Sequence, residues 1–89
     1  MNNKQALGAL AMDLKRIAFG YFRGSTPTVE TFFREALKRR DEIDSKNLKP
    51  YLIEFLNKIE DIRKEKKDKA AEDALLYSTI FQNASTIIS

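Results

Sequence analysis

Apolar residues recur at intervals of three and four along most of the chain, which is the spacing of one face of an α-helix. The first such stripe lies within residues 3–23 and consists of Leu7, Leu10, Leu14, Ile17 and Tyr21. Gly24 follows the last turn and supplies a C-terminal stop. The same segment carries a second apolar strip on a different face, made of Gly8, Met12, Phe19 and Phe22. A helix with two apolar faces is predicted to pack against two neighbours.

The run from Ser25 to Thr28 predicts the start of a second helix, over residues 27–43. Thr26 can cap this helix, and Pro27 suits its first turn. Its apolar stripe consists of Val29, Phe32, Phe33, Ala36 and Ile43. Arg40 falls on that stripe where a hydrophobic residue would be expected. Such an arginine lies either at the rim of the core or in a buried ion pair, and the rim is favoured.

A third helix is predicted after a cap at Asp44 or Ser45, with a stripe from Leu48 to Ile62 that has Phe55 at its centre. Seven consecutive charged residues follow, Arg63–Lys69. Asp68 can then cap a fourth helix over residues 69–88, whose apolar positions are Ala70, Ala74, Tyr77, Phe81, Ala84 and Ile88. This last segment carries no charge after Asp73.

These stripes predict a single all-α domain over residues 1–89, folded as an up-down bundle of four helices. The alternative has three helices, with one long C-terminal helix over residues 48–88, because the charged run contains neither glycine nor proline. The four-helix arrangement is favoured, since short antiparallel connections are common and helices of that length are rare in small domains.

Composition supports a helical core and points to self-association. Ile, Leu, Val and Phe account for 24 of the 89 residues, and only one of these is valine, which argues against disorder and against strands. A domain of this size is only marginally stable alone. The chain has no cysteine and no histidine, so neither a disulfide nor a typical zinc site can reinforce it. Self-association remains as a route to stability.

The same absences argue against catalysis. Histidine, the commonest general acid–base group, and the cysteine thiol are both missing, and there is no glycine-rich phosphate loop. The acidic pairs Asp41/Glu42 and Glu72/Asp73 are adjacent in sequence, so their side chains diverge by about 100° on a helix. We therefore expect no enzymatic activity, no cofactor and no metal. We also expect no membrane span, no signal peptide and a cytoplasmic location.

The surplus apolar residues of the first and fourth helices predict an interface. They are Met12, Phe19, Phe22, Leu76, Ile80 and Ile87. Because an up-down bundle makes these two helices neighbours, both strips are expected to be covered by a second copy or by another protein. The first functional hypothesis is therefore a non-enzymatic interaction module that self-associates.

Two alternatives come from charge and from the outline of the fold. The net charge is +3, and residues 1–40 carry eight Lys and Arg against three Asp and Glu. This imbalance permits a nucleic-acid backbone-binding accessory protein, with the candidate contacts Arg16, Arg23, Lys38, Arg39 and Arg40. The segment from Gly20 to Gly24 could stack on a base, although a core role is favoured. A third hypothesis, an immunity-like or regulator-like small helical protein, rests on the outline that bacteriocin immunity proteins share.

Overall fold

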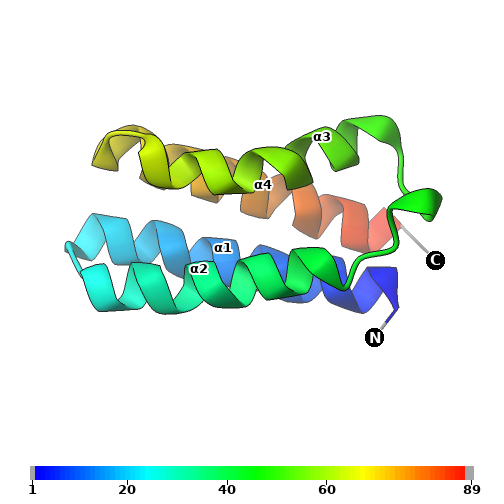
Figure 1. The fold of residues 1–89 in the computed structure, drawn as a ribbon, viewed down its shortest axis with the longest axis horizontal. Coiled ribbons are helices and arrows are strands. Elements are labelled where there is room, and N and C mark those ends of the chain that lie inside the picture. Colours follow the sequence, from blue (N-terminus) through cyan, green and yellow to red (C-terminus); the bar gives the residue numbers. More distant parts are fainter. Residues whose placement is uncertain (1, 88–89) are drawn as a thin grey trace.

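The computed structural model describes residues 2–87, which form four α-helices and two short 3₁₀-helices. The α-helices are α1 (Asn3–Arg23), α2 (Thr26–Asp41), α3 (Pro50–Lys58) and α4 (Lys67–Ile87). The 3₁₀-helices are η1 (Ser45–Asn47), between α2 and α3, and η2 (Ile59–Lys64), which extends α3. The chain runs up and down, and both of its ends lie at the same end of the bundle (Figure 1). The predicted all-α four-helix bundle is confirmed, and residues 2–87 contain no strand.

The alternative with one long C-terminal helix is wrong. The chain leaves the helical conformation at Glu65, whose backbone is extended with φ −88° and ψ 162°. α4 then runs back along the bundle, so that its apolar face packs against α1. Ile62 before the turn and Ala70 after it are both fully buried in one core. Returning the chain in this way buries apolar surface that a continuous helix would leave in water.

Most of the predicted helix ends are displaced by one to a few residues. Gly24 ends α1 as predicted, in the left-handed conformation with φ 69°, and its amide donates to the carbonyls of Gly20 and Tyr21. Ser25, and not Thr26, caps α2, because the Ser25 hydroxyl accepts a hydrogen bond from the amide of Thr28.

The remaining caps also differ from the prediction. Asp44 caps η1 and not the third α-helix, which begins at Pro50 without a side-chain cap. Asp44 is also clamped to the start of α1, because it exchanges two hydrogen bonds of 2.9 Å with the Asn3 side chain. α4 begins at Lys67, so Asp68 lies in its first turn. Ile88, at the end of the predicted stripe, lies outside the described residues.

α1 is the central helix, and it packs closely against both α2 and α4. Its predicted stripe forms the middle of the core, with Leu7, Leu10, Leu14 and Ile17 completely buried. Small residues bring α4 close: the Ser78 hydroxyl donates to the carbonyl of Ala11 over 2.7 Å, and the Ser85 hydroxyl donates to that of Lys4 over 2.9 Å. On the other side, a Cβ at Gly20 would lie only 2.9 Å from Val29 Cγ2. Glycine at this position therefore permits the close crossing of α1 and α2.

Phe55 does not lie at the centre of the third stripe, as the sequence predicted. It is only partly buried, and its ring meets Tyr77 edge-on at 5.0 Å. Leu52, Leu56 and Ile59 form the buried face of this segment. The rotation of α3 therefore places Phe55 at the rim, between α3 and α4.

Truncation of two phenylalanines tests this arrangement of the core. Phe81 is fully buried on α4, so Phe81→Ala should lower the free energy of unfolding by about 3–5 kcal/mol. Phe55→Ala should cost clearly less, because part of that ring is already in water. Urea denaturation followed by circular dichroism gives both values, and Phe81→Leu provides a milder variant for comparison. A larger loss for Phe55 than for Phe81 would contradict this core.

Candidate functional site

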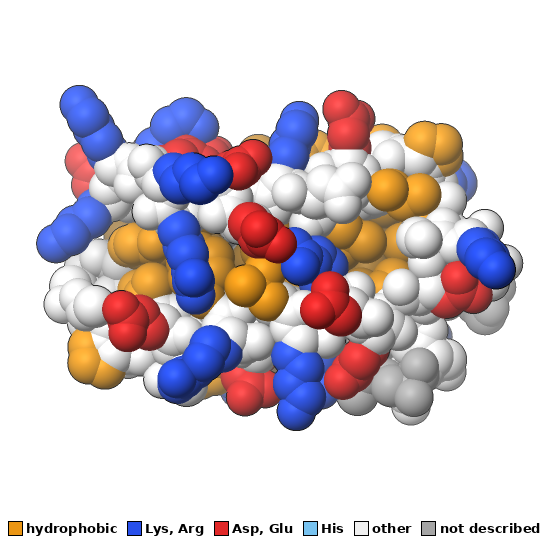
Figure 2. Space-filling view, in the orientation of Figure 1, with side chains coloured by type: hydrophobic (Ala, Val, Ile, Leu, Met, Phe, Trp, Pro, Cys, Tyr) orange, Lys and Arg blue, Asp and Glu red, His pale blue; other side chains and the backbone are white. Residues whose placement is uncertain are grey.

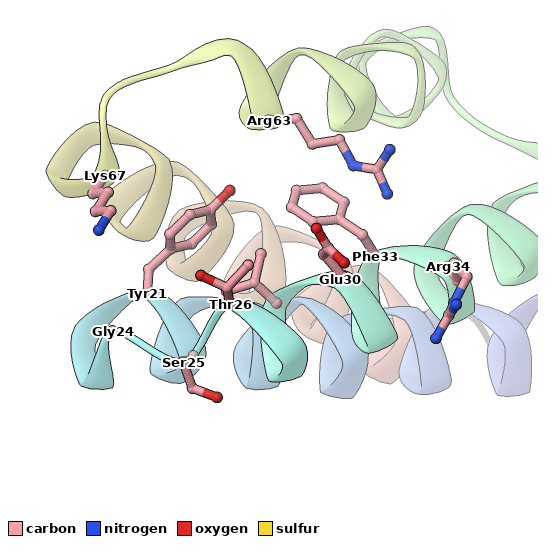
Figure 3. A pocket seen from close by; sticks show the side chains of 11 residues that line it. Tyr21, Gly24, Ser25, Thr26, Glu30, Phe33, Arg34, Arg63 and Lys67 are labelled. Carbon is pink, nitrogen blue, oxygen red and sulfur yellow. The ribbon is translucent and has the colours of Figure 1, made fainter.

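A groove of about 620 Å³ opens between the end of α1, the start of α2 and the connection from η2 to α4 (Figure 3). Tyr21, Val29 and Phe33 supply its apolar wall. Arg34, Arg63 and Lys67 line it as well and come from α2, η2 and α4. Two segments that are far apart in the sequence, residues 20–34 and 63–67, therefore build one site, and its volume falls within the range of small-molecule sites.

The segment from Gly20 to Gly24 builds one wall of the groove. Gly20 is buried at the crossing with α2, and Gly24 turns the chain into α2. Between them, Tyr21 is partly buried and meets Phe33 edge-on, with 6.5 Å between the ring centroids. Phe22 is 61% exposed and does not line the groove. The core role predicted for Tyr21 thus holds only in part, because the same ring also faces the groove.

Arg63 covers the aromatic wall of the groove. Its guanidinium lies 4.8 Å from the centroid of the Phe33 ring, which is cation–π geometry (Figure 3). Burial raises the pKa of the Tyr21 hydroxyl, and the nearby positive charge of Arg63 opposes this rise. Glu30 is the one carboxylate among the described residues that line the groove. The lining therefore carries an excess of positive charge.

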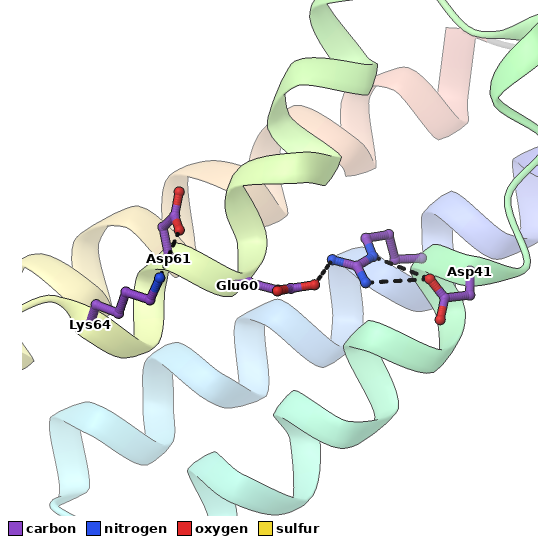
Figure 4. Close-up of polar contacts among 5 residues, drawn as sticks. Asp41, Glu60, Asp61 and Lys64 are labelled. Carbon is purple, nitrogen blue, oxygen red and sulfur yellow. Dashed lines mark hydrogen bonds and ion pairs between the residues drawn. The ribbon is translucent and has the colours of Figure 1, made fainter.

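The five cations predicted to contact nucleic acid do not form one site. Arg16 and Arg39 both face Asp13. Arg40 donates to Glu60 over 2.6 Å and pairs with Asp41 at 3.4 Å, so it links α2 to η2 (Figure 4). Arg23 and Lys38 form no ion pair within residues 2–87. Arg23 is the last residue of α1, beside the start of α2, whereas Lys38 lies in the last turn of α2, about 18 Å along that helix from Thr26 at 1.5 Å per residue.

Asp13 is a buried carboxylate that the sequence analysis did not identify. Its side chain is 7% exposed, and Asp13 Oδ2 lies 3.7 Å from Arg39 Nε with no hydrogen bond to either atom. Burial raises the pKa of this carboxyl most, Arg39 lowers it, Glu35 raises it further and Arg16 lowers it, so that the pKa is raised overall. The sequence of α1 alone could not indicate that Asp13 is buried, because Arg39, which it faces, lies on another helix.

The predicted apolar strip of α1 is exposed. Met12, Phe19 and Phe22 have exposed fractions of 46%, 42% and 61%. Leu75 is also exposed on α4. Because Ser78 contacts Ala11 and the two helices are antiparallel, Leu75 lies level with Leu14, between Met12 and Phe19. We call Met12, Phe19, Phe22 and Leu75 the α1–α4 face.

The predicted residues of α4 lie on a different side of that helix. Ser78 and Ser85 mark the direction of α1. At 100° per residue, Leu76, Ile80 and Ile87 lie about 150–170° from that direction, whereas Leu75 lies only about 70° away. Leu76 and Ile87 are exposed, and Ile80 packs partly against the core. The two predicted strips are therefore separate surfaces and do not form one continuous patch.

Charge is distributed unevenly over the bundle. Charged side chains of both signs cover the side of the molecule that Figure 2 shows, where α2, α3 and η2 lie in front. By contrast, α4 has no charged residue between Ala74 and Ile87, although half of these positions are exposed to solvent. The exposed ones are Leu75, Leu76, Thr79, Gln82, Asn83, Thr86 and Ile87. Depletion of charge is a property of the central part of protein interfaces.

Within residues 2–87, no cluster of three or more acidic side chains is placed to hold a metal ion. No helix in the same range combines the length and apolar character that crossing a membrane requires. Comparison of the chain with protein-family models, with curated proteins and with solved structures returns no match.

The buried Asp13 predicts an unusual pH dependence. Its folded-state pKa is raised above the ordinary value of 3.8, so the folded protein binds the proton more tightly than the unfolded chain does. The contribution of Asp13 to stability should therefore fall as the pH rises from 3.8 through the folded-state pKa. Urea denaturation of wild type and Asp13→Asn over a pH series measures this, and wild type should lose stability relative to the variant across that range. A relative gain for wild type would show that the ion pair with Arg39 outweighs burial.

Proposed function

We propose that this protein is a non-enzymatic interaction module that pairs with a second copy of itself through the α1–α4 face. The observation that carries the proposal is the uncharged exposed surface of α4 beside the apolar row on α1. One third of all residues in the chain are charged, yet fourteen consecutive residues of α4 carry no charge. An isolated protein gains nothing from such a surface, whereas an interface requires it.

A second copy fits this face in charge and in size. All exposed charges of α1 are positive, because its single carboxylate, Asp13, is buried. The first turns of α4 carry the exposed acids Asp68 and Glu72, together with the exposed lysines Lys67 and Lys69. A twofold arrangement that sets α1 of one copy on α4 of the other would bring the α1 cations to these acids twice, an attraction that the two lysines partly offset. The molecule measures 36 × 21 Å on its broad sides, of the order of the roughly 800 Å² that each partner buries in a stable complex.

Binding, and not catalysis, is the activity proposed here. Its support comes from the sequence, which has no histidine and no cysteine, together with the surface described above. The cytoplasmic location stays a prediction from the sequence. The nucleic-acid alternative has less support, because three of its five candidate cations already face carboxylates.

Sedimentation at tens of micromolar tests the proposal. Wild type should sediment at twice the monomer mass of 10.3 kDa. Phe19→Glu should shift the mass toward the monomer, because an interfacial carboxylate would lose its hydration without gaining a partner. Tyr51→Glu is the matched control, since Tyr51 has a similar exposure of 46% but lies on α3.

The expected result is a dimer for wild type and Tyr51→Glu and a folded monomer for Phe19→Glu. Circular dichroism confirms that all three proteins remain helical. A folded wild-type monomer would contradict self-association. Equal loss of mass in the two variants would show that the copies do not meet at the α1–α4 face.

A further inference from the structure

We propose that the groove between α1, α2 and η2 binds a small organic anion with a flat apolar body, of which an aromatic carboxylate is the simplest case. The α1–α4 face does not include this groove, so the inference is independent of self-association. It rests on three properties of the groove: its unpaired cations, its aromatic wall and its size.

The cations of the groove are not neutralised by the protein. Within residues 2–87, Arg34, Arg63 and Lys67 form no ion pair, as is true of most cations of the bundle; those that do form one are Arg16, Arg39, Arg40, Lys64 and Lys69. Glu30 also lines the groove but forms no ion pair in the same range. Three positive groups from three elements therefore line a site with one carboxylate, although they are spread along the groove and do not meet at one point (Figure 3). The charge of the site is complementary to an anion.

The wall beneath these cations is aromatic. Tyr21 and Phe33 meet edge-on, and the Arg63 guanidinium lies over the Phe33 ring (Figure 3). Phe33 itself is fully buried, so a flat apolar group would pack against the partly exposed ring of Tyr21 while its anionic group accepts hydrogen bonds from the arginine. The stacking also holds the guanidinium in place, so less side-chain freedom is lost when a ligand binds. Apolar packing and charge recognition thus occur in the same groove.

The dipoles of the helix ends around the groove partly cancel. α2 and α4 begin beside it, and their N-terminal dipoles favour an anion, but α1 ends there with the opposite dipole. The positive potential comes mainly from the three side chains. The volume of about 620 Å³ holds a two-ring compound, and it is too small for a folded partner.

Titration of the ¹⁵N-labelled protein with 2-naphthoate tests this inference, with 2-naphthalenemethanol as the neutral compound of similar shape. The naphthoate should shift the amide signals of Gly24, Thr26 and Arg63 in a saturable manner. The neutral compound should bind about tenfold more weakly, because it lacks the charge-assisted hydrogen bonds. Equal affinities for the two compounds would overturn the proposal, and so would the absence of shifts at millimolar concentration. Shifts confined to the α1–α4 face would also overturn it.

Two variants should change naphthoate binding in opposite directions, and a third serves as the control. Arg63→Gln should weaken naphthoate binding about tenfold, because it removes the charge over the aromatic wall. Glu30→Gln should strengthen binding several-fold, since it removes the one like charge of the lining. Lys64→Gln is the matched control: this neighbour of Arg63 is 81% exposed and does not line the groove. A loss in Lys64→Gln as large as that in Arg63→Gln would show only a general effect of net charge and would contradict the site.

Discussion

The close contact between α1 and α4 is the constraint on which the rest of the structure depends. Two serine hydroxyls of α4 donate to carbonyls of α1, and the buried Ala71 and Ala74 precede them on the same helix, so the two backbones approach closely. Side chains of this size lose little conformational freedom when they are buried, and each hydroxyl satisfies its own hydrogen bond. Because α2 also crosses α1 closely at Gly20, α1 is enclosed on two sides. The larger residues of its predicted stripe then fill the space toward α3 and η2.

This arrangement explains where the two candidate surfaces arise. The enclosed side of α1 cannot accommodate Met12 and Phe19, so these residues remain on its outer side beside an uncharged part of α4. On the opposite side of the bundle, α2 and η2 are held apart. They are linked by the ion pair of Arg40 with Glu60 (Figure 4) and by the contact of Arg63 with Phe33 (Figure 3). The groove lies beside this second contact. The α1–α4 face therefore results from the tight packing of α1 against α4. The groove results from the looser packing between α2 and η2.

The sequence predicted those features that depend on local periodicity. The four stripes, the stop at Gly24 and the buried leucines of α1 follow from spacing along one helix, and the structure confirms them. Features that depend on the rotation or neighbours of a helix were not predictable in this way. Phe55 shares the spacing of its stripe, but the rotation of α3 places it at the rim. Asp13 is buried because Arg39 reaches it from α2, and the groove joins two segments, residues 20–34 and 63–67, that no single stripe connects. Leu75 belongs to the α1–α4 face only because of the register set by Ser78.

The central claim is that the outer side of this helix pair contacts a second copy of the chain. Its most direct test is an isotope-filtered NOE spectrum of an equimolar mixture of ¹³C-labelled and unlabelled protein, which detects contacts between copies only. We expect cross-peaks that connect Met12 and Phe19 of one copy with Leu75 of the other. Intermolecular cross-peaks from Tyr51 or other residues of α3, with none from the α1–α4 face, would contradict the account. The absence of any intermolecular cross-peak in a folded sample would contradict it equally.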